Sequence, residues 1–395
     1  MGFWEIYLKH KTSAAVLQQL NDNLDKGVVL RKGYLSTAHH SFKENIDQIT
    51  TMASIWPLQV CIDILHHEFQ DKRESIVTQA PIFRYPKNYQ FVLFCFLLIK
   101  NKIHFHYNQL FKSESWIIAK ATMSVKQLVN GYIPNFEPVL ENSSEEYFAD
   151  PFLWPDTSKQ LMLFEHFSYK NNKGIIAMNN LHSNAYKEIF VATDCHFSYP
   201  FCFSYNKQVY GIPEQADSNK ISLYQITEEG NIIHQCNLVE NFAARDSSLF
   251  YYENYWWLFC SRKDNFENAA LYIFYSDNLF QPFTAHQNNP VKTDVRNARP
   301  AGNLFMEQNR LYRPAQDSAG AYGSVLNINM ITKLSPTAFQ EEVVRSIHPS
   351  EVGNYQGIHH ISIQGNTVLV DLKLYQFSRY NFINQLKRKF KKLMN

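Results

Sequence analysis

The chain has 395 residues, which is enough for a sizeable core and more than one domain. Aromatic residues make up 15% of the chain, a content that favours strands because aromatic rings pack well on pleated surfaces. The formal net charge of +2 gives no argument for a nucleic-acid partner, and the six cysteines follow no metal-binding spacing. We therefore expect buried free thiols, no nucleic-acid partner, no metal and no cofactor.

The first residues have neither a basic segment nor a long apolar segment, so they do not read as a signal peptide. The longest apolar run, residues 91–99, is too short to span a bilayer. A cytoplasmic location is the expectation.

The first third of the chain predicts a small α/β and helical region. Apolar residues between positions 13 and 25 recur at helical spacing and predict a helix, and residues 28–30 predict a short strand. Residues 41–69 are helical in pattern, and Pro57 begins a new helical turn or kinks the old one. Residues 88–112 are apolar and aromatic with no clear period.

From residue 147 onward the chain repeats one unit five times, at roughly 50-residue intervals. Each unit is a turn, an aromatic strand, a short polar hairpin and a second aromatic strand. The five copies of the first strand begin at Tyr147, Ser198, Arg245, Ala298 and Gly357. This period is typical of propeller blades rather than of helical repeats.

Tight-turn signals stand where such blades need them. They are Asn206-Lys207, Glu253-Asn254, Gln308-Asn309 and Gly365-Asn366. The sequence therefore predicts a mainly β fold: a five-bladed β-propeller over residues 113–378, preceded by the small α/β and helical region of residues 1–112. A β-sandwich is the alternative, but it would not explain the period.

The inner strands of a propeller meet at its axis, so residues at corresponding positions of the blades converge there. Three carboxylates are the candidates for catalysis, namely Asp150, Glu214 and Asp246. The candidates for substrate binding are Arg245, Arg296, Arg299, Arg313, Asp317, His359 and His360. Carboxylates bind sugar hydroxyls, aromatic rings stack on pyranose faces, and arginine binds a carboxylate or phosphate.

Two alternatives stay open for these residues. Two carboxylates facing each other across a glycosidic bond would supply an acid and a base or nucleophile. The same acids would otherwise cap turns and pair with neighbouring arginines to hold the blades together. The pair His359 and His360 has no third metal ligand at a telling spacing, although a single ion on the axis is not excluded.

Several strings in this region resemble a known family. The most specific are Asp294-Val-Arg-Asn-Ala-Arg-Pro-Ala-Gly302 and Tyr312-Arg-Pro-Ala-Gln-Asp317. Residues 115–375 resemble the N-terminal domain of plant glucosamine inositolphosphorylceramide transferase and its bacterial relatives, which is similar to the five-bladed propellers of the arabinanase and furanosidase superfamily. In the plant protein the transferase chemistry sits in a separate domain.

This resemblance implies a sugar or glycan ligand at the propeller axis, with a role in surface polysaccharide or glycolipid biosynthesis. In furanosidase-type enzymes the base is a first-blade aspartate, which Asp150 matches, and the acid is a glutamate that follows a second aspartate. Here Glu214 precedes Asp246, so the order of the acids departs from that pattern. An active glycoside hydrolase or glycosyl-transferring enzyme is one alternative, and a non-catalytic interaction scaffold is the other.

Residues 1–70 are similar to the second half of a formyltransferase catalytic domain, as in methionyl-tRNA and sugar N-formyltransferases. The strings Gly2-Phe-Trp-Glu-Ile6 and Leu24-Asp-Lys-Gly-Val-Val-Leu30 carry this resemblance. It places Asp25 on the family's Asp-x-Gly position, while the family's upstream Asn and His have no counterpart. We expect a truncated remnant without formyl transfer, because a lone aspartate lacks an oriented base and a stabiliser for the oxyanion.

The last segment, residues 379–395, predicts a basic amphipathic helix. Its apolar residues at helical spacing are Ile383, Leu386, Phe390 and Leu393, with five basic residues around them. Such helices can lie on anionic membrane surfaces, so an anionic membrane is a candidate partner and the inner face of the membrane a candidate location. The alternative is a solvated terminal helix.

Overall fold

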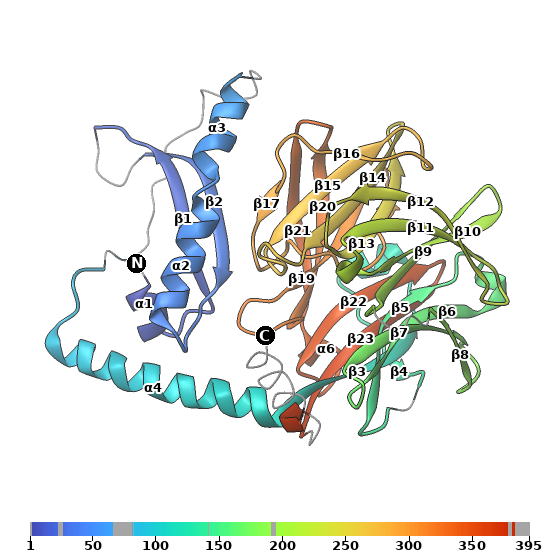
Figure 1. Ribbon diagram of the computed structural model, residues 1–395, viewed down its shortest axis with the longest axis horizontal. Helices are drawn as coiled ribbons and strands as arrows, with labels where there is room; N and C mark the ends of the chain where they lie inside the picture. The colour runs from blue at the N-terminus through green and yellow to red at the C-terminus, as the bar shows by residue number, and fades with distance from the viewer. Residues whose placement is uncertain are drawn as a thin grey trace.

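The computed structural model describes residues 2–22, 27–65, 81, 83–140, 142–190, 195–377 and 381–383. Most of these residues form a five-bladed β-propeller, and a smaller N-terminal unit lies beside it (Figure 1). The predicted mainly β fold with five blades is confirmed.

The N-terminal unit is a two-stranded antiparallel hairpin with helices against it. Its elements are α1 (Phe3–Tyr7), β1 (Thr12–Gln19), β2 (Val28–Ser36), α2 (Phe42–Ala53) and α3 (Trp56–Leu65). Ser41 caps α2 by accepting a hydrogen bond from the Glu44 N–H, and Pro57 is the second residue of α3, where its missing N–H is not needed. The predicted strand at 28–30, the helices after residue 41 and the new turn at Pro57 are confirmed as far as Leu65.

The helix predicted between residues 13 and 25 is wrong, because residues 12–19 form strand β1. Ser13 and Ala15 are buried while Ala14 and Val16 are exposed, which is the alternation of a strand. A short apolar run fits both periods, and the pairing of β1 with β2 decides between them.

Helix α4 (Asn88–Phe111) leads from this unit along the molecule to the propeller (Figure 1). Its apolar side chains are mostly exposed, and Phe94 is its buried residue. Within the described ranges, no helix has both the length and the apolar character needed to cross a membrane.

Each blade is a four-stranded antiparallel sheet, and one of them has an added short strand. Blade 1 is β5 (Glu146–Leu153), β6 (Leu161–Ser168), β7 (Lys173–Asn180) and β8 (Tyr186–Phe190). Blade 2 is β9 (Ser198–Tyr205), β10 (Gln208–Glu214), β11 (Lys220–Ile226) and β12 (Ile232–Glu240). Blade 3 is β13 (Ala244–Tyr252), β14 (Tyr255–Arg262), β15 (Ala270–Ser276), β16 (Thr284–Ala285) and β17 (Lys292–Thr293).

The last two blades complete the ring. Blade 4 is β18 (Phe305–Glu307), β19 (Arg310–Asp317), β20 (Val325–Leu334) and β21 (Phe339–Ile347). Blade 5 combines β22 (Gly357–Gln364) and β23 (Thr367–Phe377) with the earlier strands β3 (Lys112–Thr122) and β4 (Glu137–Pro138). The two ends of the propeller sequence thus share one sheet, which closes the ring. Short helices α5 (Val125–Val129) and α6 (Pro349–Val352) and two 3-10 turns (Thr157–Lys159 and Ala216–Ser218) lie in the connections.

The four predicted hairpin turns are confirmed. In three of them both turn residues have positive φ, for example 48° at Asn206 and 62° at Lys207, and Gly365 has φ of 59° in the fourth. Two consecutive residues with positive φ form the turn whose twist matches that of the flanking strands.

An apolar cluster attaches the N-terminal unit to the propeller. Leu35, Met52 and Trp56 of the unit pack with Val295 and Ala319 of the propeller. Two hydrogen bonds accompany this contact, from the Val295 N–H to the Tyr34 carbonyl (3.0 Å) and from Ser36 Oγ to the Ser318 carbonyl (2.8 Å). The contact places β2 and α3 along the side of blades 3 and 4.

Asp25 and most of the predicted segment 379–395 lie outside the described residues, so the formyltransferase resemblance and the basic helix stay predictions. Residues 381–383 are helical, and Asn381 Nδ2 donates a hydrogen bond to the Gln109 carbonyl at the end of α4 (3.2 Å).

Candidate functional site

An equivalent four-residue segment lies near the axis in each blade, on the inner strand in blades 1, 2, 3 and 5 and before β18 in blade 4. The segments are Ala149-Asp-Pro-Phe152, Ser198-Tyr-Pro-Phe201, Arg245-Asp-Ser-Ser248, Ala298-Arg-Pro-Ala301 and Ile358-His-His-Ile361. In blades 1, 2, 3 and 5 the pairing with the second strand shifts register across the segment, so its two middle residues are unpaired. The first middle residue is in turn Asp150, Tyr199, Asp246, Arg299 and His359, and these five residues occupy equivalent places.

The bulged segments hold three non-glycine residues in the left-handed region. The φ angles are 50° at Asp150, 44° at Tyr199 and 51° at Asp246. Such a conformation costs on the order of 1–3 kcal/mol per residue and persists only where surrounding contacts compensate for it.

Buried carboxylates supply this compensation by accepting hydrogen bonds from the bulged backbone. The Asp150 N–H donates to Asp371 Oδ2 (3.0 Å), the Tyr199 N–H to Asp150 Oδ2 (3.3 Å) and the Asp246 N–H to Glu214 Oε2 (3.1 Å). Hydrogen bonds to an ionised acceptor are stronger than neutral ones. The axial acids therefore help to shape the inner strands.

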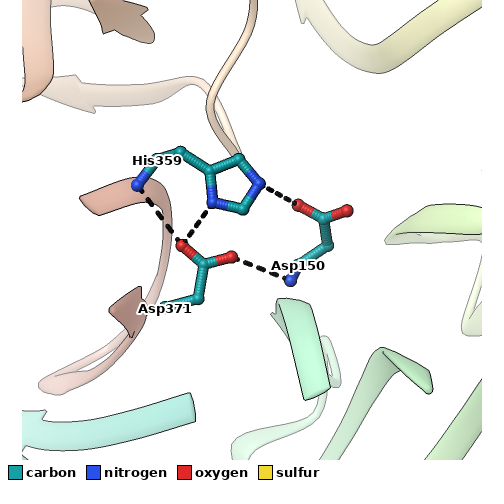
Figure 2. A group of neighbouring side chains, drawn as sticks. All are labelled: Asp150, His359 and Asp371. Carbon is teal, nitrogen blue, oxygen red and sulfur yellow. Dashed lines mark hydrogen bonds and ion pairs between the residues drawn. The ribbon is translucent and has the colours of Figure 1, made fainter. Parts of the chain in front are cut away.

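His359 joins two of these carboxylates (Figure 2). Its Nδ1 lies 2.7 Å from Asp371 Oδ1 and its Nε2 lies 3.3 Å from Asp150 Oδ1. Burial alone would lower the pKa of His359, but the two carboxylates raise it to about 10. Burial would raise the pKa of Asp150, but the hydrogen bond and charge of His359 hold it below the usual value. The imidazolium thus neutralises part of the buried negative charge.

The same three side chains have a spacing that suits a metal ion. One ligand atom from each of Asp150, His359 and Asp371 lies within 4.8 Å of the others. A coordinating imidazole nitrogen needs a free lone pair, so an ion here would have to displace the proton that His359 shares with a carboxylate.

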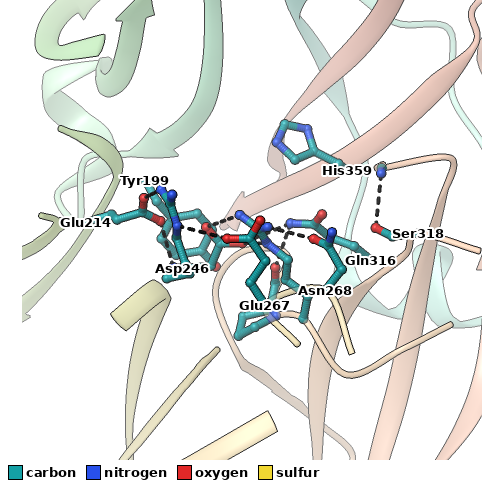
Figure 3. A network of polar contacts seen from close by, with 12 residues as sticks. Tyr199, Glu214, Asp246, Glu267, Asn268, Gln316, Ser318 and His359 are labelled. Atoms are coloured by element: carbon teal, nitrogen blue, oxygen red, sulfur yellow. Dashed lines mark hydrogen bonds and ion pairs between the residues drawn. The ribbon is translucent and has the colours of Figure 1, made fainter. Parts of the chain in front are cut away.

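A second part of the network surrounds Asp246 (Figure 3). Arg299 donates to both of its oxygens, from Nε to Oδ2 (2.5 Å) and from an Nη to Oδ1 (3.3 Å), and Gln316 Nε2 donates to Oδ2 (3.1 Å). Arg299 also donates to Asn268 Oδ1 (2.8 Å) and lies over the Tyr322 ring. Burial raises the pKa of Asp246 to about 6, against the pull of Arg299 and with the help of the nearby Glu214 charge.

The third part of the network is accessible to solvent. Arg245 forms an ion pair with Glu214 and lies 3.4 Å from Glu267, and His196 lies 3.5 Å from Glu165. The side chains of Arg245, His196 and Glu267 are 21%, 30% and 39% exposed, whereas those of Glu214 and Glu165 are 1% and 7% exposed. Burial, with the charge of Arg245, lowers the pKa of His196 to about 4, so this imidazole is neutral at pH 7.

Glu165 in β6 also belongs to this network, although no motif in the sequence points to it. Its Oε1 is buried and has no hydrogen-bond partner among the described residues. Burial, and then the charges of Asp150 and Glu214, raise its pKa well above the usual value. The available signal was a single acid within the apolar run 161–167. A buried carboxyl oxygen without a hydrogen bond is unusual and calls for an explanation in function.

Six of the predicted residues are brought together here. They are Asp150, Glu214, Arg245, Asp246, Arg299 and His359. His360 packs edge-on against Phe152 and Tyr199, with its Nδ1 3.8 Å from Asp150 Oδ1. His360 therefore lies at the buried part of the network and not at its solvent-accessible end.

The structure does not bring Arg296, Arg313 and Asp317 together with these axial residues. Arg313 is fully buried and donates through Nε (2.9 Å) and an Nη (2.6 Å) to Glu341 of the outer strand β21. Arg296 pairs with Asp294 beside the N-terminal unit, and Asp317 accepts a hydrogen bond from the Ala319 N–H. Arg313 and Asp317 lie on β19, where alternation turns them to the face opposite Gln316, and Arg296 lies in a turn after β17.

Two carboxyl groups of the network have pKa values shifted in opposite directions. Asp150 has a lowered pKa and is ionised at pH 7, whereas Glu165 has a raised pKa and favours the protonated form. Such a divergence is typical of acid–base pairs. Against a hydrolytic site, the other two predicted carboxylates are engaged by arginines, Glu214 by Arg245 and Asp246 by Arg299.

The protein is therefore a five-bladed β-propeller with a buried, ion-paired polar network where its inner strands meet. The sequence comparison gives the particular family. The chain belongs to the family described as "Glucosamine inositolphosphorylceramide transferase 1, N-terminal", whose sequence model matches residues 99–366.

Curated relatives agree with this assignment. Glucosamine inositolphosphorylceramide transferase 1 of Oryza sativa subsp. japonica is 30% identical over 266 residues, which cover 64% of this chain and 34% of the rice protein. The protein of the same name from Arabidopsis thaliana is 26% identical over 267 residues, with the same coverage of 64% and 34%. The chain thus spans about a third of the length of these relatives.

Solved structures with a similar arrangement include two glycoside hydrolases. An exo-β-1,3-galactanase from Clostridium thermocellum has a TM-score of 0.42 and 13% identity over 53% of each chain. An α-L-arabinofuranosidase from Lactobacillus brevis has a TM-score of 0.39 and 13% identity over 56% of this chain and 80% of the other.

Proposed function

We propose that the propeller binds a sugar or glycan at the solvent-accessible end of the axial network. This end is formed by Glu165, His196, Arg245 and Glu267. The observation that carries the proposal is Glu165, a buried acid whose Oε1 accepts no hydrogen bond from the described residues and whose neighbours reach solvent. A protonated carboxyl both donates and accepts hydrogen bonds, which suits a ligand hydroxyl. The relatives' name, glucosamine inositolphosphorylceramide transferase 1, supports a role in glycolipid or surface polysaccharide assembly.

Binding is favoured over hydrolysis by the state of the other acids. Hydrolysis needs two carboxyl groups about 5–10 Å apart across the scissile bond. Glu214 is held by Arg245 and accepts the Asp246 N–H, and the Asp246 carboxylate is held by Arg299 and Gln316, so both acids are committed to the fold. A ligand would therefore meet Glu165 and Arg245 rather than a free pair of acids.

The test is a binding screen with amino sugars, inositol glycans and nucleotide sugars. Glu165→Gln keeps the shape of the side chain and removes its acid, and we expect it to weaken binding about tenfold or more, because the hydrogen bonds of an acid group to ligand hydroxyls are lost or altered. Glu188→Gln on β8, whose side chain is 47% exposed, is the matched control and should bind as the wild type does. Equal binding by wild type and Glu165→Gln for every ligand found would contradict the proposed axial binding site.

A second candidate is glycoside processing, with Asp150 as base or nucleophile and Glu165 as acid. The divergent pKa directions of these two groups favour it. Turnover of an aryl glycoside would be lost in both Asp150→Asn and Glu165→Gln. Turnover that survives either change, or no turnover with any glycoside the chain binds, counts against it.

We also propose that the molecule lies on an anionic membrane from the cytoplasmic side. Phe96, Ile99 and Ile103 of α4 recur at helical spacing and are 59–66% exposed. The chain passes the C-terminal end of this helix at Asn381, and the basic sequence 387–392 follows. Exposed apolar residues on a helix and a lysine-rich sequence later in the chain suit an anionic bilayer surface.

Sedimentation with vesicles tests this proposal. Binding to phosphatidylserine vesicles should weaken with salt and should fall when Ile99 and Ile103 are replaced by Glu. Vesicles of phosphatidylcholine alone should bind less. Equal binding by the double variant, or no binding to either vesicle, would overturn it.

A further inference from the structure

A groove separate from the axis lies between the N-terminal unit and the propeller. It has a volume of about 370 Å³, within the usual range of small-molecule sites. Strand β2 and helix α3 form one wall, and β17 with the β20–β21 turn forms the other. Figure 1 shows β17 on the side of the propeller that faces β2.

Positive charge is in excess in this groove. Its basic lining residues are Arg31, Lys32, Lys292, Arg296 and Lys333, and its acidic ones are Asp63 and Asp294. Both acids are already used, Asp63 by Arg31 (2.5 Å) and Asp294 by Arg296 (2.7 Å). The remaining lysines therefore have no carboxylate of the groove left to neutralise them.

The charge of Lys292 is only partly neutralised, by a carboxylate outside the groove. Its Nζ lies 2.7 Å from Glu341 Oε1, but Glu341 also accepts two hydrogen bonds from Arg313. One buried carboxylate thus serves two cations. Burial lowers the pKa of Lys292, so an added anion in the groove would stabilise its charged form.

Lys32 and Lys333 enter the groove from opposite walls. Both are exposed, and among the described residues neither forms an ion pair. Lys32 instead lies over the Tyr34 ring at 5.3 Å. Two unneutralised lysines facing one cavity repel each other unless an anion lies between them.

Arg296 is held ready for such an anion. Asp294 accepts from its Nε (2.8 Å) and from an Nη (2.7 Å), and the guanidinium lies 3.7 Å from the centre of the Tyr34 ring. These contacts fix the planar group while 43% of the side chain stays exposed. A fixed guanidinium loses little entropy when it binds a phosphate.

Contacts other than these charges hold the two parts together as well. The apolar cluster around Trp56 and the hydrogen bonds of Tyr34 and Ser36 already do so. We infer that the groove binds a small molecule carrying a phosphate or diphosphate group, with Lys32, Lys292, Arg296 and Lys333 around the anion. Gln59, Asn288 and Thr337 offer polar groups to the rest of the ligand.

Titration calorimetry on the full chain tests this inference, with inorganic pyrophosphate as the first probe. UDP and glucosamine 1-phosphate distinguish a nucleotide from a sugar phosphate as the source of the group, and sulfate at equal ionic strength is the anion control. Pyrophosphate should bind saturably and more tightly than sulfate. No saturable binding of any phosphate probe, or equal binding of sulfate, would overturn the assignment.

Charge reversal locates the site. Lys32→Glu and Lys333→Glu should each raise the Kd by about tenfold, because each replaces attraction by repulsion near the anion. Lys170→Glu makes the same charge change at an exposed position between β6 and β7 in blade 1 and should leave the Kd nearly unchanged. An equal loss in the control would show a general charge effect and overturn the groove. Glu165→Gln should not affect phosphate binding, so failure at the axis and failure at the groove are distinguishable.

Discussion

His359 in blade 5 binds Asp150 in blade 1 across the closure of the propeller ring, with Nε2 and Oδ1 3.3 Å apart. The same imidazole binds Asp371 of its own blade at 2.7 Å. Asp371 in turn accepts the Asp150 N–H, so the three groups form a closed set of contacts between the first and last blades (Figure 2). Asp371 lies on β23, opposite Ile118 of β3, so this contact joins blade 1 to the same sheet whose strand pairing closes the ring.

The stability of the protein should depend on the charge of His359. The folded-state pKa of about 10 exceeds the unfolded value of 6.5, so this stabilisation is complete below pH 6.5 and is lost as the pH rises through about 10. We expect the free energy of unfolding, from urea titrations, to fall by a few kcal/mol over that window.

His359→Asn isolates this contribution. It should be less stable at pH 6.5 and should lose the part of the pH slope that belongs to His359, whereas lysines and tyrosines titrate equally in both proteins. His182→Asn, at an exposed position, should keep the wild-type slope. A slope that is the same in all three proteins would show that the imidazole is not charged in the folded state.

Replacing Arg299 by Met should strongly destabilise the fold. The change leaves the buried Asp246 without its guanidinium partner and removes the donor to Asn268. Breaking a buried ion pair from one side costs about 3–5 kcal/mol. Arg262→Met, which breaks an ion pair with the exposed Asp264, is the control and should cost less than about 1 kcal/mol. Urea unfolding at neutral pH measures both, and equal losses would contradict a special role for Arg299.

Gly302 should not tolerate a side chain. Its φ is 127°, and an added Cβ would meet the Ile361 carbonyl oxygen at 1.8 Å. Gly302→Ala should therefore separate the inner strands of blades 4 and 5 and lower the free energy of unfolding by several kcal/mol, about 3 or more. Gly131→Ala also has positive φ, at 88°, but open space around it, and should cost only about 1 kcal/mol. Similar melting temperatures for the two variants would contradict the close approach.

Glu165→Gln should stabilise the protein at pH 7 while weakening ligand binding. The folded-state pKa of Glu165 is raised, so the wild type loses stability as the pH rises above the unfolded value of 4.5. The amide has no such penalty, and we expect a gain of about 1–3 kcal/mol that disappears below pH 4.5. Urea unfolding at the two pH values checks this, with Glu188→Gln as the control. A variant less stable than the wild type at pH 7 would contradict the raised pKa.

Local pattern was enough to predict the blades. The turn pairs such as Asn206-Lys207 and the alternating aromatic strands depend on neighbours in sequence, and the structure has the hairpins where they were expected. The inner-strand position of Asp150, Asp246 and His359 also follows from the repeat. The strand at residues 12–19 did not follow, because its short apolar run fits a helix equally well until β2 pairs with it.

The sequence did not predict which charged groups would pair with one another. Arg313 faces Glu341 of the outer strand, and Glu165 lies against acids from other strands, because the packing of separate blades decides which side chains meet. Spacing along the chain is enough to predict the repeat and the acids and bases at its inner strands. Ion pairing depends instead on distances across the fold, so the packing of the blades decides which of these groups are neutralised, which buried oxygens accept no hydrogen bond, and that Arg296 faces the N-terminal unit.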